Sequence, residues 1–330
     1  MKNLHAMLAI AVLLTSACSN AWAQKPGDSI VDLGAESASH EEVDSISVEF
    51  EWLSALQMHT DGNLLACDRG ANVIRVIDPA GKLVASIQLE FGPEAIDVAA
   101  DGTIYCGGGG QLAKMNADGK VLLTATIPDP PRTPEQQPRR YASEPHRVSG
   151  IAAGKEALFV AFGEGGHRSS KSKLFRFDLD LNDPKQIAED LRGCCQRCDV
   201  ATRDGIFYVA ENTAHRIVRF GAKGEVLGHW GEQSRTELEG FGSCCNPMNL
   251  CFGPDGVLYT SESGMARVKR YTAEGKFLGL VGYVGTTRFS SASGMAASCS
   301  NISIAVAAEG DRIYVMDYTN RHIRVLQKKQ

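Results

Sequence analysis

No long basic run interrupts the 330 residues of this chain, and its net charge is −5 with an isoelectric point near 5.9. Nucleic-acid-binding proteins need concentrated lysine and arginine to neutralise phosphates, so we expect no nucleic-acid partner. Long stretches with helical periodicity are also missing. The apolar run from Ala6 to Leu14 is too short to cross a bilayer as a permanent helix, so we expect no membrane span.

Several motifs of catalytic and cofactor sites are missing as well. The sequence has no Cys-x-x-Cys-His motif, which excludes covalently attached c-type haem. It has no Gly-x-Ser-x-Gly elbow that would present a serine nucleophile. The glycine run from Gly107 to Gly110 is not followed by a helical pattern, so it does not predict a phosphate-binding loop. No local motif therefore assigns an enzyme class.

The N-terminal segment has the features of a secretory signal peptide. Lys2 supplies a positive charge, the apolar run follows, and Ala21-Trp22-Ala23 forms a small-x-small cleavage site. A lipoprotein signal with a lipid anchor at Cys18 is the alternative interpretation. We expect a periplasmic or secreted protein in which residues 1–23 are removed and residues 24–44 form a flexible, acidic tail.

Export sets the redox environment of the ten cysteines in the sequence. Removal of the signal peptide takes Cys18 away and leaves nine, in an oxidising compartment where disulfides persist. Because nine is odd, at least one thiol is expected to be unpaired, bound to another group, or paired between chains.

A short strand rich in β-branched and aromatic residues, preceded by a turn, recurs along the chain. The ends of successive copies lie 40 to 55 residues apart. That spacing leaves room for four strands in each unit, as in a blade of a β-propeller. An alternating strand, a turn and an outer strand follow each copy in the same order. The copies are Asp61–Leu65, Asp101–Tyr105, Glu156–Phe159, Asp204–Tyr208, Asp255–Tyr259 and Asp311–Tyr314.

The last unit reaches Gln330 without an outer strand. Residues 45–50, ahead of the first unit, alternate between polar and apolar side chains and can supply it. A strand borrowed from the other terminus closes the ring and removes an exposed sheet edge. The predicted fold is all-β, a six-bladed β-propeller over residues 45–330 with four-stranded antiparallel blades and an N-terminal closing strand.

The repeated pattern of Asp-Gly, an aliphatic and aromatic strand, an acidic residue and a strand such as Arg216–Phe220 resembles the NHL-repeat family. That family contains binding scaffolds and unrelated enzymes, so the resemblance implies the fold and no single activity. The chain is also broadly similar to gluconolactonase-like propellers, which implies calcium at the channel. Its similarity to peptide-amidating-lyase-like propellers implies zinc held by channel histidines.

In a four-stranded antiparallel blade, the loop leading into the first strand and the loop between the second and third strands lie on one face. We call this the entrance face. Most of the mature cysteines fall in consecutive loops on it, at the mouth of the central channel. Long loops gathered on one face of a rigid scaffold are where binding or chemistry usually resides. These cysteines are Cys194, Cys195, Cys198, Cys244, Cys245 and Cys299.

Two uses of these cysteines remain open. Disulfides, between loops or between adjacent cysteines, would hold the loops in place, and export favours them. The alternative is a soft-metal or redox site, because thiolates bind copper or zinc and one Cys-x-x-Cys spacing runs from Cys195 to Cys198.

Acidic residues at the ends of the second strands form another candidate site. Such residues commonly cap their own turn, which is the structural interpretation. The functional alternative is a calcium or other divalent cation at the channel mouth. Its candidate ligands are Glu211, Glu262, Asp317 and Asn249. His146, followed by Arg147, is the position that fits the channel histidine of the zinc lyases.

Two function classes follow. The first is an exported binding or interaction module, expected to be monomeric, that presents the entrance face to a small molecule, a glycan or a protein. The alternative is an enzyme of hydrolase, lyase or oxidoreductase type that uses a bound metal or thiol redox chemistry.

Overall fold

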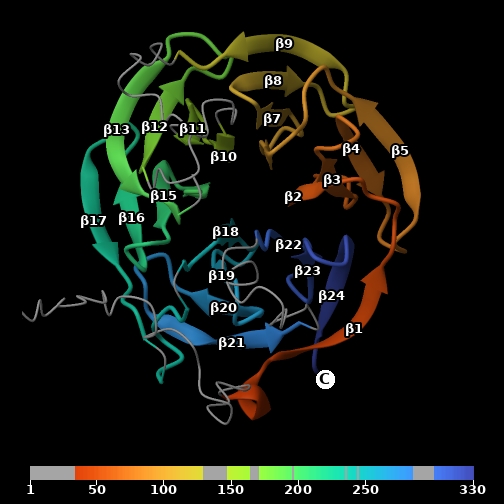
Figure 1. Ribbon diagram of the computed structural model, residues 1–330, viewed down its shortest axis with the longest axis vertical. Coiled ribbons are helices and arrows are strands. Elements are labelled where there is room, and N and C mark those ends of the chain that lie inside the picture. The colour runs from red at the N-terminus through yellow and green to blue at the C-terminus, as the bar shows by residue number, and fades with distance from the viewer. Residues whose placement is uncertain are drawn as a thin grey trace, which may run out of the picture. The chain divides into compact units, whose positions relative to one another are not determined.

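A computed structural model describes residues 34–128, 147–163, 171–194, 197–234, 236–243, 245–284 and 301–330. These residues form six four-stranded antiparallel sheets that follow one another around a central axis (Figure 1). The fold is therefore the predicted six-bladed β-propeller. The short 3-10 helix η1 (Ala35–Ser37) precedes the first strand, and no helix among the described residues is long and apolar enough to cross a membrane.

Each blade is a meander that runs from the axis outward. The strands of the first three blades are β2 (Leu53–Met58), β3 (Leu64–Asp68), β4 (Val73–Ile77), β5 (Leu83–Gln88); β6 (Ala95–Val98), β7 (Ile104–Gly108), β8 (Gln111–Met115), β9 (Val121–Thr126); and β10 (Arg147–Ala153), β11 (Leu158–Gly163), β12 (Lys171–Phe177), β13 (Lys185–Arg192).

The other three blades repeat this order. Their strands are β14 (Val200–Arg203), β15 (Ile206–Glu211), β16 (Arg216–Phe220), β17 (Val226–Trp230); β18 (Asn249–Phe252), β19 (Leu258–Glu262), β20 (Arg267–Tyr271), β21 (Phe277–Tyr283); and β22 (Ile304–Val306), β23 (Arg312–Asp317), β24 (His322–Lys328) with β1 (His40–Ile46).

The Asp-Gly turns join the first and second strands of a blade. In the turn between β2 and β3, Gly62 adopts a φ of 89°, which is costly for residues with a Cβ atom. Asp61 accepts a hydrogen bond from the backbone N–H of Asn63, the usual way in which an aspartate stabilises such a turn. Gly102, Gly205 and Gly256 have positive φ at the matching positions, so these local signals explain why the repeats were visible in the sequence.

The position of a strand in its blade decides its burial. The second strand β3 is buried along its whole length, whereas the outer strand β5 is almost entirely exposed. The inner strands are covered on both faces because neighbouring blades pack against one another. Phe159 of the third blade stacks on Phe207 of the fourth in this way, within one buried cluster. Burying such aromatic pairs contributes strongly to the stability of the ring.

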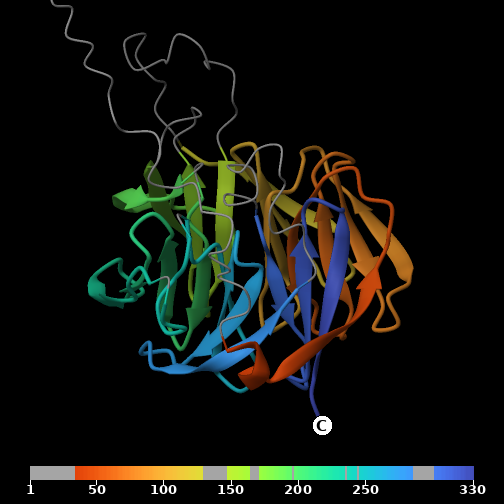
Figure 2. The same ribbon diagram turned by 60° about the horizontal axis from the view of Figure 1, so that its bottom comes forward.

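The N-terminal strand closes the ring as predicted. β1 pairs with β24 in antiparallel register, from His40 opposite Lys328 to Ile46 opposite Ile323, and the two strands run side by side in Figure 2. The bounds differ from the expected residues 45–50, since the strand starts at His40 within the segment predicted as a tail. A register shift between Glu42 and Asp44 breaks the strict alternation on which the prediction depended.

Candidate functional site

The acidic residues that end the second strands pair with an arginine of the next strand in their own blade, and they also accept backbone N–H groups. Glu211 accepts a hydrogen bond from the backbone N–H of Arg192 at 2.9 Å, and its second oxygen lies 2.5 Å from Nε of Arg216. Asp317 pairs with Arg324 at 2.7 Å and accepts from the backbone N–H of Asn320. These contacts use both oxygens of each carboxylate.

The carboxylate and its cationic partners are most fully buried in the fifth blade. Glu262 accepts a hydrogen bond from the N–H of Gly242 at 2.7 Å and forms ion pairs with Arg267 and Lys269. All three charged side chains are almost fully buried. No three metal-binding side chains cluster together within the described part of the chain. Asp317 caps its own turn as the structural interpretation expects, whereas Glu211 and Glu262 accept backbone N–H groups of the segments that precede their blades.

The cysteines on the entrance face do not form one group in the structure. Cys245 is buried in the apolar cluster between the fifth and sixth blades, and Cys194 packs against the same cluster. Cys198 is buried in a different cluster, between the third and fourth blades. Cys195, Cys244 and Cys299 lie outside the described residues, as do Cys18 and the predicted signal peptide.

No disulfide joins two cysteines within the described ranges, so the prediction of disulfides is not confirmed there. Burial raises the pKa of Cys198 to about 12, and it raises the pKa of Cys251, on β18, to about 12 as well. Both groups are therefore protonated thiols at neutral pH. A protonated thiol is a poor metal ligand and a poor nucleophile, which weakens the soft-metal and redox interpretation for these two residues.

Arg147, a sequence candidate, lies at the mouth of the central channel, while His146 falls outside the described residues. Nε of Arg147 is 4.0 Å from Oε1 of Glu94, and Nη2 of Arg69 is 3.3 Å from the same oxygen. The guanidinium of Arg69 lies 5.0 Å from the ring centroid of Trp52, a cation–π distance. Tyr318 lines the same small pocket. Arginine and exposed aromatic side chains therefore surround the mouth.

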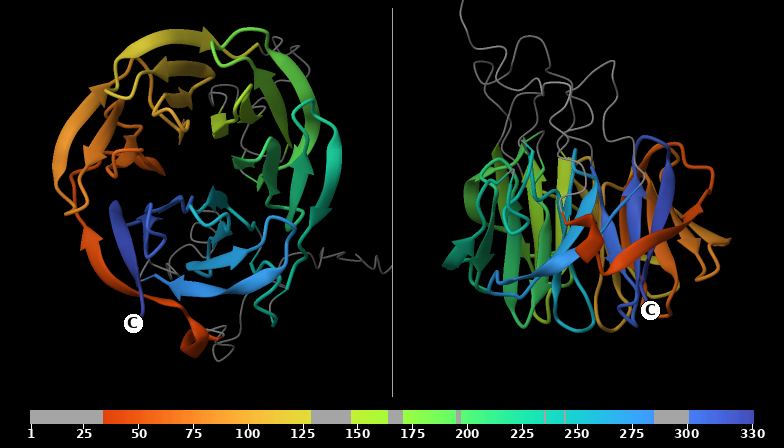
Figure 3. Two further views of the ribbon diagram at one scale, coloured as in Figure 1. Left: turned by 180° about the vertical axis from the view of Figure 1, so that it is seen from behind. Right: turned by 90° about the horizontal axis from the view of Figure 1, so that it is seen from below.

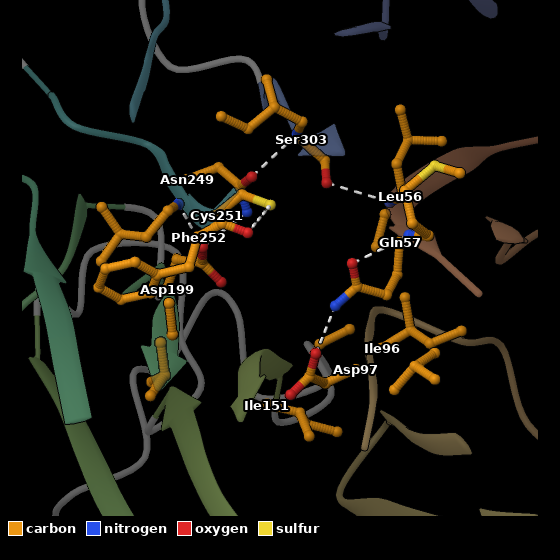
Figure 4. Close-up of a pocket in the computed structure, with 18 of the residues that line it drawn as sticks. Leu56, Gln57, Ile96, Asp97, Ile151, Asp199, Asn249, Cys251, Phe252 and Ser303 are labelled. Atoms are coloured by element: carbon orange, nitrogen blue, oxygen red, sulfur yellow. Dashed lines mark hydrogen bonds between the residues drawn. The ribbon is translucent and has the colours of Figure 1, made fainter. Parts of the chain in front are cut away.

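A cavity of about 340 Å³ lies below this mouth. All six innermost strands line it, and they surround the axis when the ring is seen from the front or from behind (Figures 1 and 3). The volume lies within the range typical of small-molecule sites. Figure 4 shows the polar side chains that point into it: Gln57, Asp97, Asp199, Asn249, Cys251 and Ser303.

Two aspartates in the cavity connect neighbouring blades. Asp97 on β6 accepts a hydrogen bond from the amide of Gln57 in the first blade and one of 2.7 Å from the backbone N–H of Ala153 in the third. Asp199, just before β14, accepts from the backbone N–H of Leu250 at 2.7 Å and from the amide of Asn249 at 2.6 Å. Each aspartate thus accepts a hydrogen bond from a backbone N–H of the next blade.

Uncharged side chains make the same connection elsewhere in the ring. Oδ1 of Asn249 accepts from the backbone N–H of Ile304, which joins the fifth blade to the sixth at 2.9 Å. Oγ of Ser303 accepts from the backbone N–H of Leu56, which joins the sixth blade to the first at 3.0 Å. Ser149 links the third blade to the fourth, because its hydroxyl accepts from the N–H of Cys198. Side-chain hydrogen bonds therefore run around the whole channel.

Burial perturbs both channel carboxylates. Loss of hydration raises the pKa of Asp97 to about 6 and that of Asp199 to about 7, with the negative charge of Asp97 adding to the effect on Asp199. Among the described residues neither carboxylate forms an ion pair, and their hydrogen bonds come from neutral backbone and side-chain amides. Titratable groups perturbed in this way within a cavity mark a candidate site.

Sequence reasoning identified Asn249 and Arg147 but missed Asp97, Asp199, Gln57 and Ser303. A usable signal was present for Asp97, which is the one acidic residue in the short first strand Ala95–Val98. A charge in a strand expected to be buried on most sides is unusual. The sequence did not indicate which of these six side chains face one another, because each comes from a different blade.

Comparisons with known proteins support the propeller fold but do not assign the chain to a family. No protein-family model matches the sequence, and no curated protein matches it. The resemblance to NHL repeats therefore stays a prediction. Several solved structures are similar, at identities that show the fold alone.

A structure of streptogramin B lyase has 14% identity and a TM-score of 0.56, with 90% of this chain and 99% of that chain covered. A gluconolactonase from Xanthomonas campestris has 14% identity and a TM-score of 0.60, with coverage of 91% and 93%. A virginiamycin B lyase from Staphylococcus aureus has 15% identity and a TM-score of 0.51, with coverage of 84% and 80%.

Proposed function

We propose that this chain is a binding module that takes a small polar molecule into the central channel through the entrance face. The cavity carries this proposal. It is large enough for a small molecule, and it brings two carboxylates, two amides and a hydroxyl group together from five blades. A few converging polar groups in a preformed cavity are the usual composition of a small-molecule site.

The similar structures support a small molecule over a protein or a glycan chain as the partner. Proteins of this fold are named for action on streptogramin B, on virginiamycin B and on a gluconolactone. One virginiamycin B lyase was solved with quinupristin, so its fold accommodates a molecule of drug size. Because a fold does not determine function, the channel residues of this chain must decide its ligand.

The proposal includes export, with the N-terminal signal peptide removed and the propeller acting outside the cytoplasm as a monomer. Cell fractionation and the intact mass of the mature protein test this part. A mass that begins at Gln24 supports cleavage after Ala23, and a lipid-modified Cys18 supports the anchored form. Thiol titration under denaturing conditions reports directly how many of the mature cysteines form disulfides.

A second candidate is an enzyme that uses the two channel aspartates as an acid and a base. Their pKa values, near 6 and 7, lie where a carboxylic acid and a carboxylate coexist at neutral pH. Proton transfer is most effective when the pKa of the group is close to the working pH. A lactone hydrolysis assay at pH 6 to 8 tests it, because turnover must disappear in both Asp97→Asn and Asp199→Asn.

The binding proposal is tested by thermal denaturation in the presence of a compound panel. The panel contains neutral sugars, hydroxy acids, amines and amino acids, each at millimolar concentration. A ligand of the channel raises Tm by mass action, since it binds only the folded protein. The shift must be lost when Ile96, which lines the cavity, is replaced by Trp, a change that fills the space. A panel with no shift for the unmodified chain contradicts the proposal.

A further inference from the structure

The charges of Asp97 and Asp199 exceed what the connection between blades requires. Asn249 accepts the backbone N–H of the next blade through a neutral amide, and Ser303 does so through a hydroxyl. An amide oxygen is also able to accept this hydrogen bond, so the bond by itself does not need an ionisable group. The second and fourth blades nevertheless have ionisable aspartates at these positions, so their charge must serve something other than the hydrogen bond.

The charge is costly in the free protein. Asp199 is buried, Asp97 is only partly exposed in the cavity, and no lysine, arginine or histidine among the described residues pairs with either carboxylate. A buried carboxylate without a cationic partner destabilises the fold unless it takes up a proton. A cationic ligand in the cavity that both carboxylates line supplies a counter-charge.

The mouth of the channel has the opposite polarity. Among the described residues, Arg69, Arg147 and Arg197 line it together with one acidic residue, Glu94. The arginines therefore outnumber the carboxylate there. Arginine binds carboxylates well because its planar guanidinium can donate two parallel hydrogen bonds. An anionic group of a ligand fits this position.

The mouth and the cavity are continuous. They share the lining residues Ser54, Glu94, Ser149, Arg197 and Asn301, so one molecule can reach both. The cavity of about 340 Å³ corresponds to on the order of ten water molecules, at about 30 Å³ for each in the liquid. That space suits an amino acid or a dipeptide, and it is too small for a folded protein segment.

We propose that the channel binds a small zwitterion, an amino acid or a short peptide, with its ammonium group at Asp97 and Asp199 and its carboxylate at the arginines of the mouth. This inference rests on the proposed binding function and names the class of ligand. A divalent metal ion is the competing occupant. It is less favoured, because each aspartate already uses an oxygen on a backbone amide and no third metal-binding side chain among the described residues joins them.

The test uses the full mature chain and isothermal titration calorimetry. Each of the twenty amino acids and a set of glycine-initiated dipeptides is titrated first. The best binder is then compared with its N-acetyl form, which lacks the ammonium group, and with its C-terminal amide, which lacks the carboxylate. We expect each modified form to bind at least tenfold more weakly, because one buried charge loses its partner.

Variants assign the two ends of the ligand. Asp97→Asn/Asp199→Asn keeps the hydrogen-bond acceptors and is expected to weaken the zwitterion at least tenfold. Arg147→Gln is expected to weaken the zwitterion and to leave its amide unchanged. Asp118→Asn/Asp180→Asn, which removes two exposed charges, is the matched control and should bind as the unmodified chain does. Circular dichroism checks that each variant is folded.

The outcomes separate the two proposals. Binding of neutral sugars or hydroxy acids without any zwitterion overturns the ligand class and keeps the binding function. No binding by any compound overturns both. Tight binding of Mg²⁺ or Ca²⁺ alone, lost in Asp97→Asn/Asp199→Asn, identifies a cation site and overturns the zwitterion. Equal affinity for the zwitterion and its N-acetyl form overturns the role of the aspartates.

Discussion

Two sets of carboxylates occupy this propeller, and their surroundings are opposite. Those at the ends of the second strands, such as Glu262 and Asp317, accept backbone N–H groups and pair with arginines of their own blades. Asp97 and Asp199 in the channel also accept backbone N–H groups, but only neutral donors surround them among the described residues. Acidic residues with the same hydrogen-bonding role thus differ in whether their charge is compensated.

The difference separates structural carboxylates from candidate functional ones. A compensated buried charge contributes to the fold, and its removal leaves a cation unpaired. An uncompensated one opposes the fold, so its removal stabilises the free protein. Stability measurements on single substitutions therefore test the distinction directly, before any ligand is known.

The largest effect is expected for Glu262→Gln. This change leaves the guanidinium of Arg267 and the ammonium of Lys269 buried without their counter-charge. Removing one partner of a buried ion pair costs roughly 3–5 kcal/mol, so the free energy of unfolding should fall by about that amount. Urea denaturation at pH 7 measures it. Glu237→Gln, an exposed position nearby, is the control, and equal stabilities for the two variants would contradict the prediction.

Asp199→Asn is expected to raise the free energy of unfolding at pH 8, in contrast to Glu262→Gln, which lowers it. The pKa of Asp199 is raised to about 7, above that of the unfolded chain. Its contribution to stability is therefore full at acidic pH and is lost as pH rises through 7. At pH 8 the lost contribution is about 4 kcal/mol, since each pKa unit corresponds to roughly 1.4 kcal/mol, and the neutral amide avoids the loss.

Urea denaturation of the unmodified chain and Asp199→Asn at pH 5 and pH 8 checks this prediction. The unmodified chain should lose more stability than the variant between the two pH values. Asp97→Asn should show a smaller change in the same direction, because its pKa is raised only to about 6 and its side chain is partly exposed in the cavity. Parallel pH dependences for all three proteins would show that the channel charges are compensated.

Ser303→Ala tests the hydrogen bonds around the channel without changing any charge. Its hydroxyl accepts the backbone N–H of Leu56, a buried donor that has no other acceptor in the variant. An unsatisfied buried donor costs about 1–3 kcal/mol. A decrease in Tm that is equal at pH 5 and pH 8 is expected, and it distinguishes this loss from that of an ionisable group.

Arg216→Gln should have the smallest effect. Arg216 pairs with Glu211, but its side chain is 36% exposed, so water can replace it beside the carboxylate. The expected loss is about 1 kcal/mol, within the range of partly exposed ion pairs. Denaturant titration beside Glu262→Gln provides the comparison. A loss of stability as large as that of Glu262→Gln would mean that burial does not determine how much these ion pairs contribute.

The sequence predicted the fold because its signals are local. Asp61-Gly62 and its equivalents specify a turn through positive φ and aspartate hydrogen bonds, and both effects act within a few residues. The sequence predicted that an N-terminal strand closes the ring, but it placed the strand at the wrong residues. A register shift near Asp44 disturbs the alternation of side chains there. The candidate site was predicted only in part. Asn249 and Arg147 line the channel and its mouth, and the aspartates between them were missed.

What the sequence alone determined is therefore the blade: its turns, its four strands and the order in which they follow. The tertiary structure alone decided what meets in the channel. Asp97 and Asp199 lie about a hundred residues apart, and they come to one cavity only because the ring closes. The acids that end the second strands find their arginines on the next strand of the same blade, as Glu211 does with Arg216. Whether the channel aspartates have a cationic partner depends instead on the neighbouring blades that surround them in space.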